Sequence, residues 1–263
     1  MKKTGEETIF ETNEFSAIRD ALSTSSQDSL VVFDVDEVLL TASDQVLRHK
    51  KYFNDEFSNQ VAKNSLTESE IFNLISIFFS ERKAKLVDVG FVDLIRDMQS
   101  KNIKTIALTN CSTGRIGKMP SMKDWRLNEL NRLGYHFERS WKDTESKVFE
   151  HLATEIAGSA PVFEKGVLLT NGVSKGLVLK AFLDYQQYKP SKIIFIDDRM
   201  DYIESVQEIA ADASIPYVGI QFTATEHQMP NLNEKRAAFQ LEVLFKEKKW
   251  LSDEDASLLL EGG

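Results

Sequence analysis

The sequence contains very little cysteine. Cys111 is the one cysteine among 263 residues, so it cannot form a disulfide within the chain. A cluster of thiolates that binds zinc is excluded for the same reason. We therefore expect the chain to fold in a reducing compartment, and we predict a cytoplasmic protein.

Long hydrophobic runs are also missing. The longest apolar stretch, IFNLISIFF at residues 71–79, is interrupted by Asn73 and Ser76. It is much shorter than the roughly 20 residues that a membrane-spanning helix needs. The first residues, MKKTGEETIFETNEF, include two lysines but no apolar segment behind them, so we expect no secretory signal peptide. The sequence predicts a soluble protein without a transmembrane segment.

Basic residues are outnumbered by acidic ones. The chain has 32 lysines and arginines against 41 aspartates and glutamates, which gives a formal net charge of −9. An acidic chain without a basic stripe is not expected to bind a nucleic-acid backbone. The hydrophobic fraction of 42% is ordinary for a globular protein. The length is sufficient for a sizeable core in one or two domains.

The hydrophobic pattern predicts strands that alternate with helices. Continuous apolar runs, which are typical of strands buried in a parallel sheet, occur at 30–33, 103–110, 192–197 and 215–222. Helical periodicity occurs at 12–23, 88–100, 122–133, 174–189 and 199–211, and from about residue 233 onward. Residues 135–170 are harder to assign, although 161–172 suggest a strand or hairpin with Gly166 at a turn or bulge. The alternation indicates an α/β fold with a doubly wound parallel sheet flanked by helices.

Residues 37–88 interrupt this alternation with helices only. Within them, Thr67 and Glu70 have the spacing of a capping box at the start of a helix. We interpret 37–88 as a small helical insertion, or cap. The core domain would then consist of residues 1–36 and 89–263.

Polar residues stand where four predicted segments reach the carboxyl edge of the sheet, which is where active sites of open α/β sheets lie. They are Asp34 and Asp36, Thr109, Lys175, and Asp197, Asp198 and Asp201. Carboxylates this close together repel one another unless cations offset their charge. Lys175 can offset one charge and a divalent cation the rest. Ligands that are all oxygen atoms favour Mg²⁺.

Each of these signals alone also has an ordinary structural explanation. Acids after a strand commonly form turns or cap helices, a threonine in a strand is a usual β-branched residue, and a lysine on a helix is usually solvated. What indicates a site is that all four segments occur in order, each at a strand end or a helix start.

The four segments resemble the four motifs of the haloacid dehalogenase (HAD) superfamily. DVDEV resembles its first motif, DxDx[TV], and TIALTN resembles the second. Lys175 in NGVSKG matches the third motif, and IIFIDDRMD matches the fourth. The resemblance extends over about residues 28–222 and implies a Rossmann-like HAD core with a C1-type cap. KGVLLTNGVSKG, IIFIDDRMDYIESV and KKWLSDEDA further resemble a little-characterised HAD group. That group is known mostly from intracellular bacteria and includes secreted effectors with phosphotyrosine phosphatase activity.

The resemblance implies a Mg²⁺-dependent phosphatase. Asp34 would be the nucleophile that forms an aspartyl-phosphate. Asp36, an acid that the dehalogenases lack at this position, would be the general acid and base. Thr109 and Lys175 would neutralise and orient the phosphate.

The resemblance also implies a set of metal-binding residues. The ligands would be the carboxylates of Asp34 and Asp198 and the backbone carbonyl of Asp36. Asp197 would orient a metal-bound water. The alternative is the reverse assignment, in which Asp197 ligates the metal and Asp198 orients the water. Asp201 and Asn110 would hold the ligands in place.

The implied substrate is a phosphomonoester, either a small molecule or a phosphoprotein, with phosphotyrosine as one substrate class. An alternative function is that of a HAD-fold binding or effector protein, which acts through a partner surface with little catalysis. The helical C-terminal segment is where such a surface would lie. The resemblance to effectors also implies, as a second localisation, export into a host cell by a route that needs no signal peptide.

Overall fold

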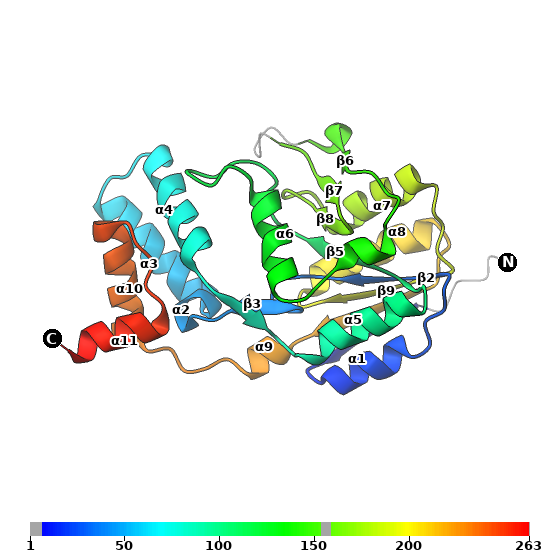
Figure 1. Cartoon of the computed structure of the whole chain (residues 1–263), viewed down its shortest axis with the longest axis horizontal. Coiled ribbons are helices and arrows are strands. Elements are labelled where there is room, and N and C mark those ends of the chain that lie inside the picture. Colours follow the sequence, from blue (N-terminus) through cyan, green and yellow to red (C-terminus); the bar gives the residue numbers. More distant parts are fainter. Residues whose placement is uncertain (1–6, 154–158, 263) are drawn as a thin grey trace. The chain divides into compact units, whose positions relative to one another are not determined.

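The computed structural model describes residues 7–153 and 159–262 (Figure 1). The chain divides into two compact units. The first unit consists of the residues up to Leu40 together with Leu86–Thr113 and Lys123–His227. The second consists of Thr41–Lys85, Gly114–Met122 and the residues from Gln228 on.

The first unit is built on a mostly parallel sheet. Its described strands are β1 (Glu7–Thr12), β2 (Ser29–Phe33), β5 (Lys104–Thr109), β6 (Lys147–Val148), β7 (Val162–Glu164), β8 (Val167–Leu169), β9 (Lys192–Asp197) and β10 (Tyr217–Phe222). They lie in the order β1-β10-β9-β2-β5-β8-β7-β6. Neighbours are parallel from β1 to β8, whereas β8, β7 and β6 pair in antiparallel fashion.

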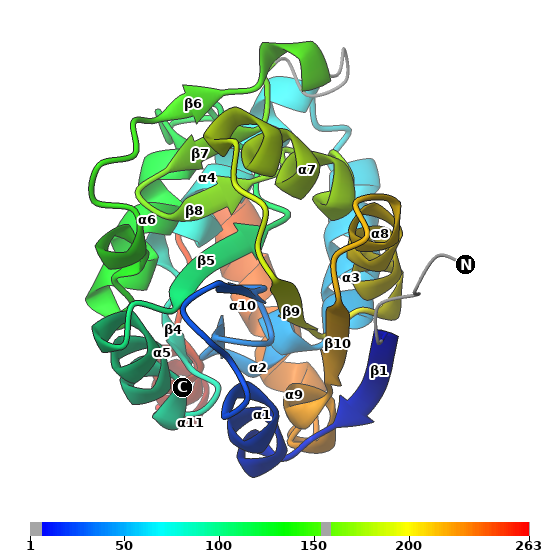
Figure 2. The same ribbon diagram turned by 90° about the vertical axis from the view of Figure 1, so that its right-hand side faces the viewer.

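Helices cover both faces of this sheet, as a doubly wound fold requires. In Figure 2, α7 (Lys175–Gln186) and α8 (Met200–Asp212) lie on one face, and α1 (Phe15–Leu22) and α5 (Gly90–Ser100) lie on the other. The unit also contains most of α6 (Met122–Arg132) and the short α9 (Ala224–His227). All five residues of β2 are buried, which is why this strand appears in the sequence as an unbroken apolar run. The predicted α/β class and parallel sheet are confirmed.

Some elements of this unit are not visible in the hydrophobic pattern. The edge strand β1 is partly exposed along its length, so it shows no continuous apolar run. Short 3₁₀ helices at Phe137–Ser140 and Glu150–Leu152 are too brief to produce a period. The predicted hairpin at 161–172 is present as β7 and β8, and Gly166 forms its turn with φ 78°.

The second unit is helical apart from one small sheet. Its helices are α2 (Gln45–Arg48), α3 (Lys50–Lys63), α4 (Glu68–Glu81), α10 (Glu234–Glu247) and α11 (Asp253–Glu261). The capping box of Thr67 and Glu70 at the start of α4 is confirmed. Where the chain enters and leaves the segment 41–85, β3 (Leu40–Ala42) pairs with β4 (Ala84–Leu86), and neither strand was expected from the sequence.

The core of the second unit is formed jointly by the insertion and the C-terminal helices. Phe53 and Leu74 pack in one cluster with Leu244 and Trp250. Buried Asp44 accepts hydrogen bonds of 2.9 Å from the indole Nε1 of Trp250 and from a backbone N–H of α11. The residues after 227 thus belong to this compact unit, whereas the sequence pattern assigns them to the core domain. Amphipathic periodicity indicates that one face of a helix is buried, but it does not identify the element that covers this face. The role of 37–88 as a cap stays a prediction.

We find no helix in the described ranges with the length and apolarity that crossing a lipid bilayer demands. The prediction about a signal peptide concerns the N-terminal stretch, of which residues 1–6 lie outside the described residues.

The start of α7 packs closely against α8. Gly176 follows Lys175 there, and a Cβ atom at this glycine would lie 1.9 Å from the backbone oxygen of Ser205 on α8. Because a backbone oxygen cannot rotate away as a side chain can, the two helices approach at this distance only if residue 176 has no side chain. Gly176 therefore determines where the first turn of α7 sits.

We predict that Gly176→Ala lowers the free energy of unfolding by about 1–3 kcal/mol, the usual cost of overpacking. At an open helix position the same change would stabilise the protein by about 1 kcal/mol. Urea unfolding of the purified variant measures the difference. As a control, exposed Lys180→Ala on the same helix should change stability by less than about 0.5 kcal/mol. A Gly176→Ala protein as stable as the wild type would contradict the close approach.

Candidate active site

The candidate site is formed where β2, β5 and β9 end. These strands are adjacent and parallel, with Phe33 of β2 paired to Ala107 of β5 and to Ile196 of β9. One residue later, the backbone N–H of Asp34 donates to the carbonyl oxygen of Ile196 at 2.8 Å. This register places the residues after β2 and at the end of β9 side by side at one edge of the sheet.

Lys175 lies at the centre of this edge. Its side chain is completely buried, and its Nζ donates to Asp34 Oδ1 at 2.5 Å and to Asp197 Oδ2 at 2.6 Å. The ring of Tyr202, on α8, lies over the same ammonium group with its centroid 4.5 Å away. The predicted residues Asp34, Lys175 and Asp197 are therefore in direct contact.

The electrostatics of this cluster follow from burial and charge. Burial raises the pKa of Asp197 to about 8, and repulsion from Asp34 acts in the same direction. Burial also raises the pKa of Asp34, against the opposing effect of Lys175. For Lys175, burial alone would lower the pKa, but the Asp34 and Asp197 carboxylates raise it above its ordinary value. The lysine is thus held as a cation between two acids, of which it can neutralise only one.

The cluster can also hold a divalent cation. Asp34, Asp197 and Asp198 each offer a carboxylate oxygen, and these three atoms lie within 4.8 Å of one another. Nearby at the end of β5, the hydroxyl of Thr109 is buried and has no hydrogen-bond partner among the described residues. Oxygen ligands and an excess of negative charge are what a hard cation requires. The residues present therefore fit a metal.

The side chains of Asp197 and Asp198 differ in their hydrogen bonds and in their burial. Both oxygens of Asp197 are occupied, because Oδ2 accepts from Lys175 and Oδ1 accepts from the backbone N–H of Arg199 at 2.9 Å. The side chain of Asp198 is only partly buried, and its backbone carbonyl accepts from Gln221 Nε2. Asp197 is therefore engaged through both of its carboxylate oxygens with Lys175 and with the turn at Arg199.

The two residues expected in supporting positions have different surroundings. Asp201 accepts from Arg199 Nε at 3.0 Å and from its Nη2 at 2.6 Å. Asn110 Nδ2 donates to the hydroxyl of Tyr202 at 2.9 Å. Its Oδ1 accepts from the Thr170 hydroxyl and from the Gly172 backbone. Asn110 thus connects the ends of β5 and β8 to α8.

Asp36 has a partner that the sequence did not indicate. Both of its carboxylate oxygens accept hydrogen bonds from Nη2 of Arg126, on α6, at 3.0 and 2.7 Å. The signal that could have found Arg126 is the pair Arg126 and Glu129, three residues apart on a helix. Such pairs are ordinarily solvent-exposed, so the spacing alone does not distinguish this one. Tyr202 was missed likewise, since aromatic residues on helices usually pack in cores.

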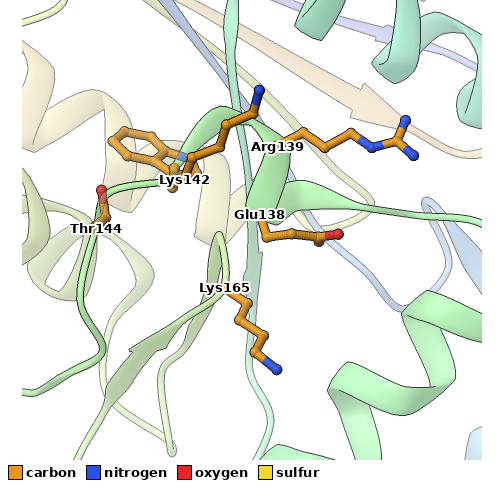
Figure 3. A pocket seen from close by; sticks show the side chains of 6 residues that line it. Glu138, Arg139, Lys142, Thr144 and Lys165 are labelled. Carbon is orange, nitrogen blue, oxygen red and sulfur yellow. The ribbon is translucent and has the colours of Figure 1, made fainter.

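A pocket of about 330 Å³ lies elsewhere on the first unit and is lined by Glu138, Arg139, Trp141, Lys142, Thr144 and Lys165. Its basic character suggests an anion site. Figure 3, however, shows the amines of Lys142 and Lys165 at opposite ends of the view, rather than directed at a common point. Lys165 also precedes β8, whereas the candidate site lies beyond the carboxyl ends of the strands. None of the predicted site residues lines this pocket.

We predict that Lys175→Met lowers the free energy of unfolding by about 3–5 kcal/mol, because it leaves buried carboxylates without their cation. The double variant Lys175→Met, Asp197→Asn should recover part of this loss, since it removes one of the unpaired charges. Chemical denaturation of both variants, with exposed Lys180→Met as the matched control, measures the effect. If the free energy of unfolding of Lys175→Met lies within about 1 kcal/mol of the wild-type value, the buried ion pairs contribute little to stability.

Proteins with related sequences occur in Rickettsia and Chlamydia. "Uncharacterized protein RP296" of Rickettsia prowazekii is 22% identical over 243 residues, which cover 92% of this chain and 87% of that protein. A Chlamydia trachomatis protein named "Putative outer membrane protein" is 25% identical over 232 residues, which cover 87% of this chain and 81% of that protein. Among solved structures, a HAD family hydrolase from Salmonella enterica serovar Typhi aligns with a TM-score of 0.33 at 10% identity, over 77% of this chain and 74% of that one.

The sequence also matches a family over most of its length. The match covers residues 11–257, a range that includes every residue of the candidate site. The chain therefore belongs to the family described as "Protein of unknown function (DUF2608)".

Proposed function

We propose that this protein is a Mg²⁺-dependent phosphatase of the HAD type that hydrolyses a phosphomonoester through an aspartyl-phosphate on Asp34. The observation that carries the proposal is the contact of buried Lys175 with both Asp34 and Asp197. This contact brings together residues from three of the four segments that resemble the motifs of the superfamily. Thr109, from the remaining motif, ends the strand next to β2.

In the first step, a carboxylate oxygen of Asp34 attacks phosphorus and the bond from phosphorus to the ester oxygen breaks. Asp36 donates a proton to that leaving oxygen. The Lys175 ammonium group, from the first residue of α7, and the Thr109 hydroxyl, at the end of β5, would stabilise the negative charge of the phosphoryl group. The buried Thr109 hydroxyl lacks a protein partner among the described residues, so it can donate to a phosphate oxygen.

In the second step, the Asp36 carboxylate accepts a proton from a water molecule. The oxygen of that water attacks phosphorus, the bond between phosphorus and Asp34 breaks, and inorganic phosphate leaves. Asp34 and Asp36 thereby return to their starting protonation states. Two easier displacements replace a single difficult one.

The carboxylates of Asp34 and Asp198 and the backbone carbonyl of Asp36 would hold the metal. A bound Mg²⁺ supplies positive charge that offsets the charge of the phosphate. Asp197 is better placed to fix Lys175 and the turn at Arg199, because both of its oxygens already accept hydrogen bonds.

We further propose that the segment 37–88 acts as a cap that selects the substrate. It leaves the core directly after Asp36 and returns before α5, the chain position of a C1-type cap. In the HAD group that the sequence resembles, phosphotyrosine in proteins is a known substrate class, and we propose it for this protein.

We predict that Asp34→Asn abolishes turnover of p-nitrophenyl phosphate, with kcat reduced by about 10³-fold or more, because an amide cannot replace the carboxylate nucleophile. Exposed Asp184→Asn on α7 is the matched control and should retain wild-type activity. Circular dichroism establishes that both variants are folded. A folded Asp34→Asn protein with most of its activity would contradict the mechanism. A wild type without turnover of any phosphate ester would favour the binding-protein alternative.

Metal dependence is expected to follow from the same carboxylates. Millimolar Mg²⁺ should raise the thermal unfolding midpoint of the wild type, because a ligand that binds the folded state stabilises it. Asp198→Asn should lose this shift and Asp184→Asn should keep it. Activity should disappear in EDTA and fall when Ca²⁺ replaces Mg²⁺, since Ca²⁺ takes more oxygen ligands at longer distances and would occupy the attacking oxygen of Asp34. Full activity in EDTA would contradict the metal assignment.

A further inference from the structure

The environment of Asp36 contains a buried cation that the mechanism above does not use. The Arg126 side chain, on α6, is only 4% exposed, whereas that of Asp36 is 40% exposed. Nη2 of Arg126 donates to both carboxylate oxygens of Asp36, at 3.0 and 2.7 Å. The interior of the protein thus contacts one side of this carboxylate, and the rest of it remains accessible.

Arg126 is itself held by a second acid. Its Nη1 donates to Glu129 Oε2 at 2.6 Å, and the Glu129 side chain is 2% exposed. Burial alone would lower the pKa of Arg126, but Asp36 and Glu129 raise it above its ordinary value. Since Glu129 already neutralises the guanidinium, Asp36 can turn toward a substrate without leaving an isolated buried cation.

The backbone around Asp36 is fixed by a tight turn. The N–H groups of Leu39 and Leu40 both donate to the carbonyl oxygen of Val35 at 3.0 Å. The N–H of Glu37 donates to the carbonyl oxygen of Leu40 at 2.7 Å, and Glu37 has φ 67°. With its main chain held in this way, Asp36 retains freedom mainly in its side-chain torsions, and those are what the contact with Arg126 restricts.

A purely stabilising role does not explain this arrangement well. Replacing a buried ion pair with apolar side chains of similar volume is often neutral or stabilising. Here one of the two acids is the residue to which the proposed reaction assigns proton transfer. General acid catalysis requires that residue within hydrogen-bond reach of the leaving oxygen.

We propose that Arg126 is a positioning residue that orients the Asp36 carboxyl for proton transfer to the leaving oxygen, and that Glu129 holds Arg126 in place. This inference rests on the proposed phosphatase function. It assigns to α6 a part in catalysis, although α6 contributes no group that touches the reacting atoms.

The test compares two substrates that differ in their need for a proton. p-Nitrophenolate leaves readily without protonation, whereas the alkoxide released from glycerol 2-phosphate does not. Values of kcat/KM are compared because they include the steps up to departure of the leaving group, and so exclude hydrolysis of the aspartyl-phosphate. The variant is Arg126→Met with Glu129→Gln, which removes both buried charges together and so leaves no unpaired one.

We expect kcat/KM of this double variant to fall by about 10–100-fold for glycerol 2-phosphate and by less than about threefold for p-nitrophenyl phosphate, as loss of general acid assistance predicts. Lys123→Met serves as the matched control. It removes an ion pair to Glu164 of 2.9 Å from the same helix and should leave the ratio of the two substrates unchanged.

Equal losses on both substrates, no loss, or faster cleavage of glycerol 2-phosphate would each overturn the positioning role. If the double variant does not fold, Arg126→Lys replaces it, because a single ammonium cannot reproduce the two arms of the guanidinium. The same selective loss, smaller in size, is then expected, and an unchanged ratio overturns the proposal. A wild type that hydrolyses neither substrate would instead refute the proposed function, and this inference with it.

Discussion

The ammonium group of Lys175 lies in the interior of the first unit between the carboxylates of Asp34 and Asp197. A buried lysine is stable only if its charge is paired and its protons are hydrogen-bonded. The positions of its partners depend in turn on the parallel pairing of β2 with β9, which brings the two strand ends together. The position of Lys175 itself depends on α7 lying close to α8, a contact that Gly176 permits. The site is thus a consequence of how the sheet and these two helices pack.

The charges at this edge of the sheet do not balance. Asp34, Asp197 and Asp198 carry three negative charges when ionised, and Lys175 supplies one positive charge. The negative charge that Lys175 does not offset is favourable for the proposed function, because a site with excess negative charge and oxygen ligands attracts a divalent cation. It is unfavourable for stability, because burial and repulsion from a neighbouring carboxylate raise the pKa values of Asp34 and Asp197. Perturbed groups of this kind are frequent at catalytic sites.

Arg126, on α6, forms a second cluster like that of Lys175. It too is a buried cation between two acids, with Glu129 enclosed and Asp36 partly exposed. In both clusters the cation fixes a carboxylate that the proposed reaction uses, Asp34 in one and Asp36 in the other. Both clusters lie within the first unit, so the described groups that act on these two aspartates belong to one compact body.

The amino-acid sequence by itself determined the elements with a local signal. Apolar runs identify β2, β5, β9 and β10, since strands buried on both faces need no alternation. Motif order places Asp34, Thr109, Lys175 and Asp197 at strand ends and a helix start, and the sheet brings Asp34 and Asp197 together at Lys175.

Tertiary structure alone decided the contacts between segments that are distant in sequence. It paired β1 with β10 at the edge of the sheet, joined the C-terminal helices to the segment 41–85, and placed Arg126 on Asp36. Periodicity records which face of an element is buried, but it carries no information about the partner. A buried Arg126–Glu129 pair and a solvated one have the same spacing, and they differ only in what the rest of the chain packs around them.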